Sequence, residues 1–203
     1  MESRLPPSRP GPHPEPPADL STRPLPIVED AGPWLRIHQT RYAALHFGRS
    51  GDGRFDAPLG EYGMLYAGSD AHAAFAETFG QSTGINTVTS ASLAGRSLSS
   101  IEAIRPLRLV DLTGPGLARV GADERLCSGD HEVAQRWARE FWHHPEAPDG
   151  LRYRARHDPS RPCVALYDRA DPMLRATLLG GMLDPTLSGR LGDILDTYGF
   201  GLV

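Results

Sequence analysis

Proline is distributed very unevenly along this chain of 203 residues. Nine of its 19 prolines lie between Pro6 and Pro26. Proline fixes φ and has no backbone N–H to donate, and this stretch holds few apolar side chains whose burial could offset the entropy of ordering. We therefore expect residues 1–30 to be an extended or disordered tail, more typical of a plain linker than of a proline-rich ligand for another domain. We expect residues 31–203 to form one domain.

Beyond the tail, apolar runs typical of strands mix with amphipathic segments typical of helices. Asp130 can cap a helix that continues to about His143, because Val133, Trp137 and Phe141 recur at helical spacing. Another helix is expected from Ala71, after a cap at Ser69 or Asp70, to Phe79, and a short one at Leu191–Tyr198. Strands are expected at Trp34–His38, Gly63–Ala67, Arg105–Thr113 and Cys163–Tyr167. Because the two kinds of segment do not alternate regularly, the pattern predicts an α+β fold rather than a doubly wound sheet.

The charged residues exclude several functions. The chain has 21 basic and 25 acidic residues, a formal net charge of −4, and contains no lysine. Without lysine there is no Walker A phosphate loop and no Schiff-base chemistry on a lysine amine. The acidic balance also argues against a nucleic-acid backbone as the main ligand, so we expect no direct nucleic-acid binding.

Other common motifs are missing from the sequence. No apolar run is long enough to span a bilayer, and the first residues do not resemble a signal peptide, so we expect a cytoplasmic protein without membrane contact. Cys127 and Cys163 belong to no C-x-x-C pair and are expected to be reduced and buried. His131 and Glu132 begin an H-E-x-x-H motif, but Gln135 stands where the second metal ligand would be. We interpret this segment as a solvent-facing helix start and expect no metal site.

Four residues form the best candidate site. Arg36 lies in the first predicted strand, Arg54 follows a glycine-rich loop, Tyr66 ends the next strand, and Glu77 lies on the following helix. Two guanidinium groups can hold a pyrophosphate through paired hydrogen bonds, and a tyrosine ring can stack on a flat base. A carboxylate beside them could stabilise a sugar cation or bind a ribose hydroxyl. Surface ion pairs would explain the same residues, so spacing alone does not identify the site.

Several segments, in this order, resemble the RES domain, a bacterial family. The matching segments are LRIH at Leu35–His38, GRFDAP at Gly53–Pro58, YGMLYAGSDAHAAFAETF at Tyr62–Phe79, RPLRLVDLTG at Arg105–Gly114, GLRYRARHDPSRPCVALYDRA at Gly150–Ala170 and DTYGFGLV at Asp196–Val203. Together they span most of residues 34–203. The resemblance implies that residues 31–203 form a RES domain.

The resemblance implies an ADP-ribosyltransferase-like fold with a small mixed β core and surrounding helices. It also implies a toxin of a toxin–antitoxin pair that breaks the nicotinamide–ribose bond of NAD, with water or phosphate as acceptor. NAD is then the substrate, and the partner is an antitoxin with a helix-turn-helix domain. By the match, Arg36 and Arg54 would bind the phosphates or ribose of NAD, Tyr66 would hold the nicotinamide end, and Glu77 would be the catalytic carboxylate.

One position departs from the family pattern. Where the resemblance leads us to expect serine in a G-[IL]-x-Y-x-S-x-R segment, this chain has Ala155. Two alternatives therefore stay open beside NAD cleavage: a protein ADP-ribosyltransferase, and a catalytically weakened protein that binds NAD or a partner. Self-association into a homo-oligomer also stays open.

Overall fold

The computed structural model describes residues 12–80, 84 and 86–203. Their main feature is an eight-stranded sheet in the order β1-β6-β7-β8-β3-β2-β5-β9, in which only the β6–β7 pair is parallel. The strands are β1 (Ile27–Asp30), β2 (Trp34–Gln39), β3 (Met64–Gly68), β5 (Arg96–Ala103), β6 (Leu107–Asp111), β7 (Gly150–Ala155), β8 (Asp158–Tyr167) and β9 (Leu174–Gly181). A second, two-stranded sheet pairs β4 (Thr87–Val88) with β10 (Gly201–Leu202). The predicted α+β class is confirmed, although the sheet is larger than the small core we expected.

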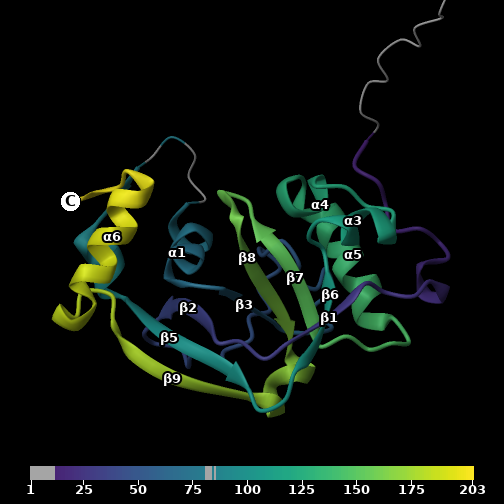
Figure 1. Ribbon diagram of the computed structural model, residues 1–203, viewed down its shortest axis with the longest axis horizontal. Coiled ribbons are helices and arrows are strands. Elements are labelled where there is room, and N and C mark those ends of the chain that lie inside the picture. The colour runs from purple at the N-terminus through teal and green to yellow at the C-terminus, as the bar shows by residue number, and fades with distance from the viewer. Residues whose placement is uncertain (1–11, 81–83, 85) are drawn as a thin grey trace, which may run out of the picture.

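Helices pack on this curved sheet in two groups. Figure 1 shows α1 and α6 near one end of the sheet and α3, α4 and α5 near the other, with β7 and β8 between the groups. The α-helices are α1 (Ala71–Phe79), α2 (Ser90–Ala94), α3 (Pro115–Val120), α4 (Arg125–Ser128), α5 (His131–His143) and α6 (Ser188–Tyr198). Short 3₁₀ turns follow at η1 (Leu20–Thr22), η2 (Asp168–Met173) and η3 (Pro185–Leu187). In the described part of the chain, no helix is long and apolar enough to cross a membrane.

Buried side chains form separate clusters under the two groups of helices. Under α5, Trp137 and Phe141 pack with Leu151 of β7 and Tyr167 of β8. Under α1 and α6, Phe75 packs with residues of β2, β5 and α6. A third cluster includes Trp34, Leu65 and Leu166. Because apolar burial is the main stabilising contribution, each helix group is fixed to its own part of the sheet.

The capped helices confirm the sequence prediction. The side chain of Asp70 accepts a hydrogen bond from the backbone N–H of Ala73 at 2.8 Å, and α1 ends at Gly80. The side chain of Asp130 accepts from the N–H of Glu132 at 3.1 Å at the start of α5. These local signals are enough to predict where the helices begin, because a capping side chain satisfies N–H groups that a helix leaves without an internal partner.

The serine-rich strand β5 was not predicted. Ser99 is fully buried, and its hydroxyl lies 3.0 Å from Nε2 of His38 on the neighbouring strand β2. The hydroxyl of Ser97 pairs with that of Thr40 at 3.0 Å. Buried polar groups are tolerated when they are hydrogen-bonded. The tertiary partner therefore decides that this polar segment forms an interior strand.

From residue 12 onward, the segment that we expected to be an extended or disordered tail packs on the domain. β1 adds an edge strand to the sheet beside β6, and Leu20 is buried to 2% exposure. Nε1 of Trp137 donates to the carbonyl oxygen of Pro14 at 2.8 Å. Arg136 makes two hydrogen bonds to the carboxylate of Glu15. The few apolar residues of this segment are enough to order it, because α5 offers both an apolar surface and donors for the carbonyl groups of the segment. Residues 1–11 lie outside the described residues.

Candidate active site

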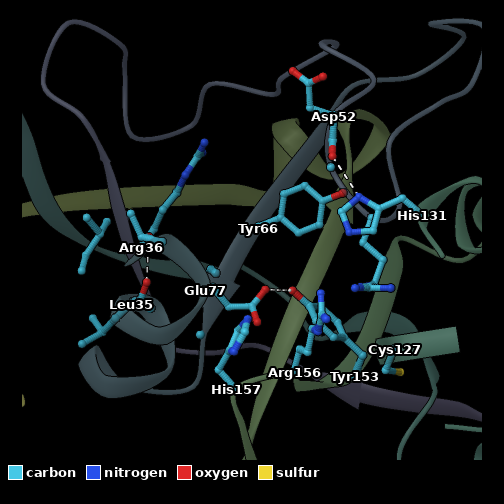
Figure 2. A pocket seen from close by; sticks show the side chains of 17 residues that line it. Leu35, Arg36, Asp52, Tyr66, Glu77, Cys127, His131, Tyr153, Arg156 and His157 are labelled. Carbon is cyan, nitrogen blue, oxygen red and sulfur yellow. Dashed lines mark hydrogen bonds between the residues drawn. The ribbon is translucent and has the colours of Figure 1, made fainter. Parts of the chain in front are cut away.

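The four candidate residues come together around one pocket. Arg36 of β2, Arg54 of the following loop, Tyr66 of β3 and Glu77 of α1 all line a cavity of about 340 Å³. A cavity of this size lies at the lower end of small-molecule sites. Figure 2 shows Arg36 and His131 on opposite sides of the pocket, with Tyr66 and Glu77 between them. The structure thus joins residues that the sequence could only list.

Glu77 is the central acidic group. Its Oε2 accepts a 2.7 Å hydrogen bond from the hydroxyl of Tyr153, a residue of β7 that is 2% exposed (Figure 2). Burial raises the pKa of Glu77, and the Tyr153 hydrogen bond and the positive charge of Arg54 oppose that rise. A carboxylate in such surroundings can act as a base or as a fixed negative charge toward a developing cation.

The strand before α1 approaches the helix closely. A Cβ atom at Gly68, the last residue of β3, would lie 2.5 Å from Cβ of Ala73 and 2.6 Å from the backbone nitrogen of Ala74. Only glycine permits this distance without a shift of the helix. The contact fixes how far into the pocket α1 carries Glu77.

Arg54 and Arg36 supply positive charge from two directions. Nη1 of Arg54 donates to the carbonyl oxygen of Gly129 at 2.8 Å, and Nη1 of Arg36 donates to that of Ala44 at 2.7 Å. Burial lowers the pKa of Arg54, with a further contribution from the positive charge of Arg156. Burial lowers the pKa of Arg36 to about 10, so its side chain stays charged at neutral pH. Half-buried guanidinium groups of this kind suit an anionic ligand.

Tyr66 lines the pocket with its ring, because its hydroxyl is already hydrogen-bonded to the neighbouring loop. Its hydroxyl donates to Oδ1 of Asp56 at 2.8 Å and accepts from the backbone N–H of Phe55 at 2.9 Å. A Cβ atom at Gly53 would lie 2.7 Å from this hydroxyl and 2.4 Å from Oδ1 of Asp56, so a larger residue there would displace these two hydrogen-bonded groups. The ring face remains able to stack on a flat group.

Sequence reasoning missed several lining residues. Tyr153 lies in β7, Arg156 and His157 form the turn between β7 and β8, and His131 lies at the start of α5. The prediction that His131 and Glu132 face solvent holds, because both are exposed, but His131 also lines the pocket. Only the resemblance could have singled out Tyr153, since it falls in the segment from Gly150 to Arg156 and has no motif of its own.

The cysteines are free and buried, as expected. Cys127 lines the pocket, and burial raises the pKa of its thiol to about 11. A thiol in this state is protonated at neutral pH and is a poor nucleophile. Among the described residues, no group of three or more histidine, cysteine, aspartate or glutamate side chains could hold a metal ion.

Ala155 is not among the residues that line the pocket. It is 1% exposed and packs in the cluster under α5. Tyr153 precedes it by two positions, so the two side chains leave β7 on the same face. The methyl group thus fills part of the core in the position where the family pattern has a serine hydroxyl.

These features define an α+β protein with an arginine-bearing pocket around the half-buried carboxylate of Glu77. The model of the RES domain matches residues 33–180, and the chain belongs to this family. A similar curated protein is the "Probable toxin y4kH" of Sinorhizobium fredii, 33% identical over 114 residues, which are 56% of this chain and 87% of that protein. Among solved structures, the chain is similar to one in the Mycobacterium tuberculosis MbcT–MbcA toxin–antitoxin complex, with a TM-score of 0.59 and 19% identity over 81% of this chain and 91% of that one. At that identity the likeness concerns the fold alone.

Proposed function

We propose that this RES-domain protein is a toxin that cleaves the nicotinamide–ribose bond of NAD. The observation that carries the proposal is that one half-buried carboxylate, Glu77, and two half-buried arginines, Arg36 and Arg54, line a single cavity. The arginines would bind the pyrophosphate, and the ring of Tyr66 would stack on the nicotinamide. No metal ion is needed for this chemistry.

The chemistry uses the positive charge of the nicotinamide ring. The bond between the ring nitrogen and the ribose breaks, and its electron pair stays on the nitrogen, so nicotinamide leaves as a neutral molecule. The ribose gains oxocarbenium character, which the carboxylate of Glu77 stabilises directly or through a ribose hydroxyl. The oxygen of water or phosphate then bonds to the anomeric carbon. Water gives ADP-ribose and a proton, and phosphate gives ADP-ribose 1″-phosphate.

Two similar proteins support our proposal of an antitoxin partner. The similar solved chain comes from a toxin–antitoxin complex, and the curated relative is named a probable toxin. We propose that an antitoxin with a helix-turn-helix domain neutralises this chain by covering the pocket.

The direct test is NAD consumption by the purified protein, with and without phosphate, with the products identified by mass. We expect loss of NAD with release of nicotinamide and with ADP-ribose or its 1″-phosphate as the other product. The variant Glu77→Gln keeps the size and removes the charge, so turnover should fall at least about a hundredfold. Glu102→Gln is the matched control, because Glu102 is exposed on β5 outside the pocket lining and should leave turnover unchanged.

Ala155 favours a second candidate, a protein that binds NAD without cleaving it. NAD binding with no product from the folded wild-type chain would support that candidate and refute catalysis. A protein ADP-ribosyltransferase would instead transfer labelled ADP-ribose to a protein and release little free ADP-ribose.

A further inference from the structure

The loop that carries Arg54 is held by side chains of α5. The amide nitrogen of Gln135 donates to the carbonyl oxygens of Gly51 at 2.8 Å and Gly53 at 3.0 Å. Nδ1 of His131 lies 3.0 Å from the carbonyl oxygen of Asp52. Three consecutive carbonyl groups are therefore bound from one helix. The two side chains can share this task because positions i and i+4 lie on the same helix face.

The other side of the loop is held by a buried carboxylate. Oδ2 of Asp56 accepts from the backbone N–H groups of Gly51 and Gly53, both at 3.1 Å, and Asp56 is 4% exposed. Its Oδ1 accepts from the hydroxyl of Tyr66 at 2.8 Å. The N–H groups and the carbonyl groups of the same glycines thus have separate partners.

Ordering a glycine-rich loop in this way has an entropic cost. Glycine loses more backbone freedom on ordering than any other residue, so these contacts must offset a large entropic cost. Gln135 is 8% exposed, and both hydrogens of its amide are used on the loop. Arg54 comes directly after the restrained glycines, and its own Nη1 reaches the carbonyl oxygen of Gly129, close to the start of α5.

We propose that Gln135 is a positioning residue that fixes Arg54 in the pocket before the ligand arrives. This inference rests on the proposed function for the identity of the ligand, an ADP-ribosyl compound, and goes beyond it by giving α5 a part in recognition. A guanidinium whose place is set in advance binds a phosphate without a further loss of entropy. The position where a zinc protease motif would have its second histidine therefore has a different task here.

The variant Gln135→Met tests the proposal, because methionine has similar length and no hydrogen to donate. We expect the KM for NAD to rise about tenfold while kcat changes less than about twofold. The dissociation constant for ADP-ribose, measured by calorimetry, should rise by a similar factor. Gln39→Met makes the same chemical change at the end of β2, outside the pocket lining, and should leave all three values unchanged.

A double-mutant cycle separates positioning from a general loss of structure. If Gln135 acts through Arg54, the substitution Gln135→Met should weaken ADP-ribose binding far less in the background of Arg54→Ala than in the wild type. Hydrogen exchange should also become faster at the backbone amides of residues 51–54 while α5 stays protected.

The outcomes distinguish this inference from the proposed function. NAD cleavage with additive effects in the cycle would overturn the positioning role and leave the enzyme intact. Coupled ADP-ribose binding without NAD cleavage would support the positioning role and refute the enzyme. Failure of the wild-type chain both to bind ADP-ribose and to cleave NAD would overturn both.

Discussion

Removal of the Tyr153 hydroxyl should change how the activity depends on pH. This hydroxyl donates to Oε2 of Glu77 at 2.7 Å in a buried setting, and it lowers a pKa that burial raises. Tyr153→Phe takes away that lowering, so the pKa of Glu77 should rise further above its ordinary value. If catalysis requires the ionised carboxylate, the acidic limb of the pH profile should move to higher pH.

The size of the effect follows from the strength of the bond. A hydrogen bond to a charged group contributes about 1.5–3 kcal/mol. Where Glu77 is mostly protonated in both proteins, the ionised fraction, and with it kcat/KM, should therefore be about 10- to 150-fold lower in the variant. On the alkaline side of the limb, where the carboxylate is ionised in both, the two rates should converge.

The assay is the rate of NAD consumption at low NAD concentration between about pH 5 and pH 9. Tyr167→Phe is the control, because the hydroxyl of Tyr167 is equally buried and donates at 2.7 Å to the carbonyl oxygen of Ala138, and neither residue lines the pocket. It should lower stability without moving the limb. An identical acidic limb in Tyr153→Phe and the wild type would refute the argument that this hydroxyl supports the ionised form of Glu77.

Three further substitutions test the pocket. Because burial raises the pKa of Glu77, ionisation of Glu77 lowers the stability of the fold as pH rises from the unfolded-state pKa through the folded-state pKa. Glu77→Gln should therefore melt at a higher temperature than the wild type at pH 8, and this difference should disappear in acid. An unchanged melting temperature at pH 8 would contradict the expectation. Gly68→Ala should lower the free energy of unfolding by about 1–3 kcal/mol in urea, because the new methyl group would lie 2.6 Å from the backbone of α1; wild-type stability would mean that the helix shifts freely. Asp56→Asn should also lower the free energy of unfolding in urea by about 1–3 kcal/mol and raise the KM for NAD, since two loop N–H groups and the Tyr66 hydroxyl lose a charged acceptor. A lower stability with an unchanged KM would show that Arg54 does not depend on this carboxylate.

Local signals in the sequence determined the elements that they describe. The caps at Asp70 and Asp130 and the helical spacing of Trp137 and Phe141 predicted α1 and α5 correctly, because capping and amphipathicity act within a few residues. Apolar composition likewise predicted β2, β3, β6 and β8. The candidate residues Arg36, Arg54, Tyr66 and Glu77 were named from the sequence, but spacing could not separate them from surface ion pairs. The family resemblance was needed to join them.

Only the tertiary structure determined the remaining elements and the contacts of the site, because the residues that stabilise them are distant in the chain. Ser99 lies in an interior strand since His38 lies beside it, and the N-terminal segment is ordered from residue 12 since α5 binds it. Tyr153 supports Glu77 across 76 positions of sequence, and Gln135 holds Gly51 across 84. A hydrogen bond between such residues has no local pattern; it exists because the sheet brings β7 to α1 and packs α5 against the loop. The sequence thus contained the candidate side chains, and the fold determined which of them meet and which groups hold their charges.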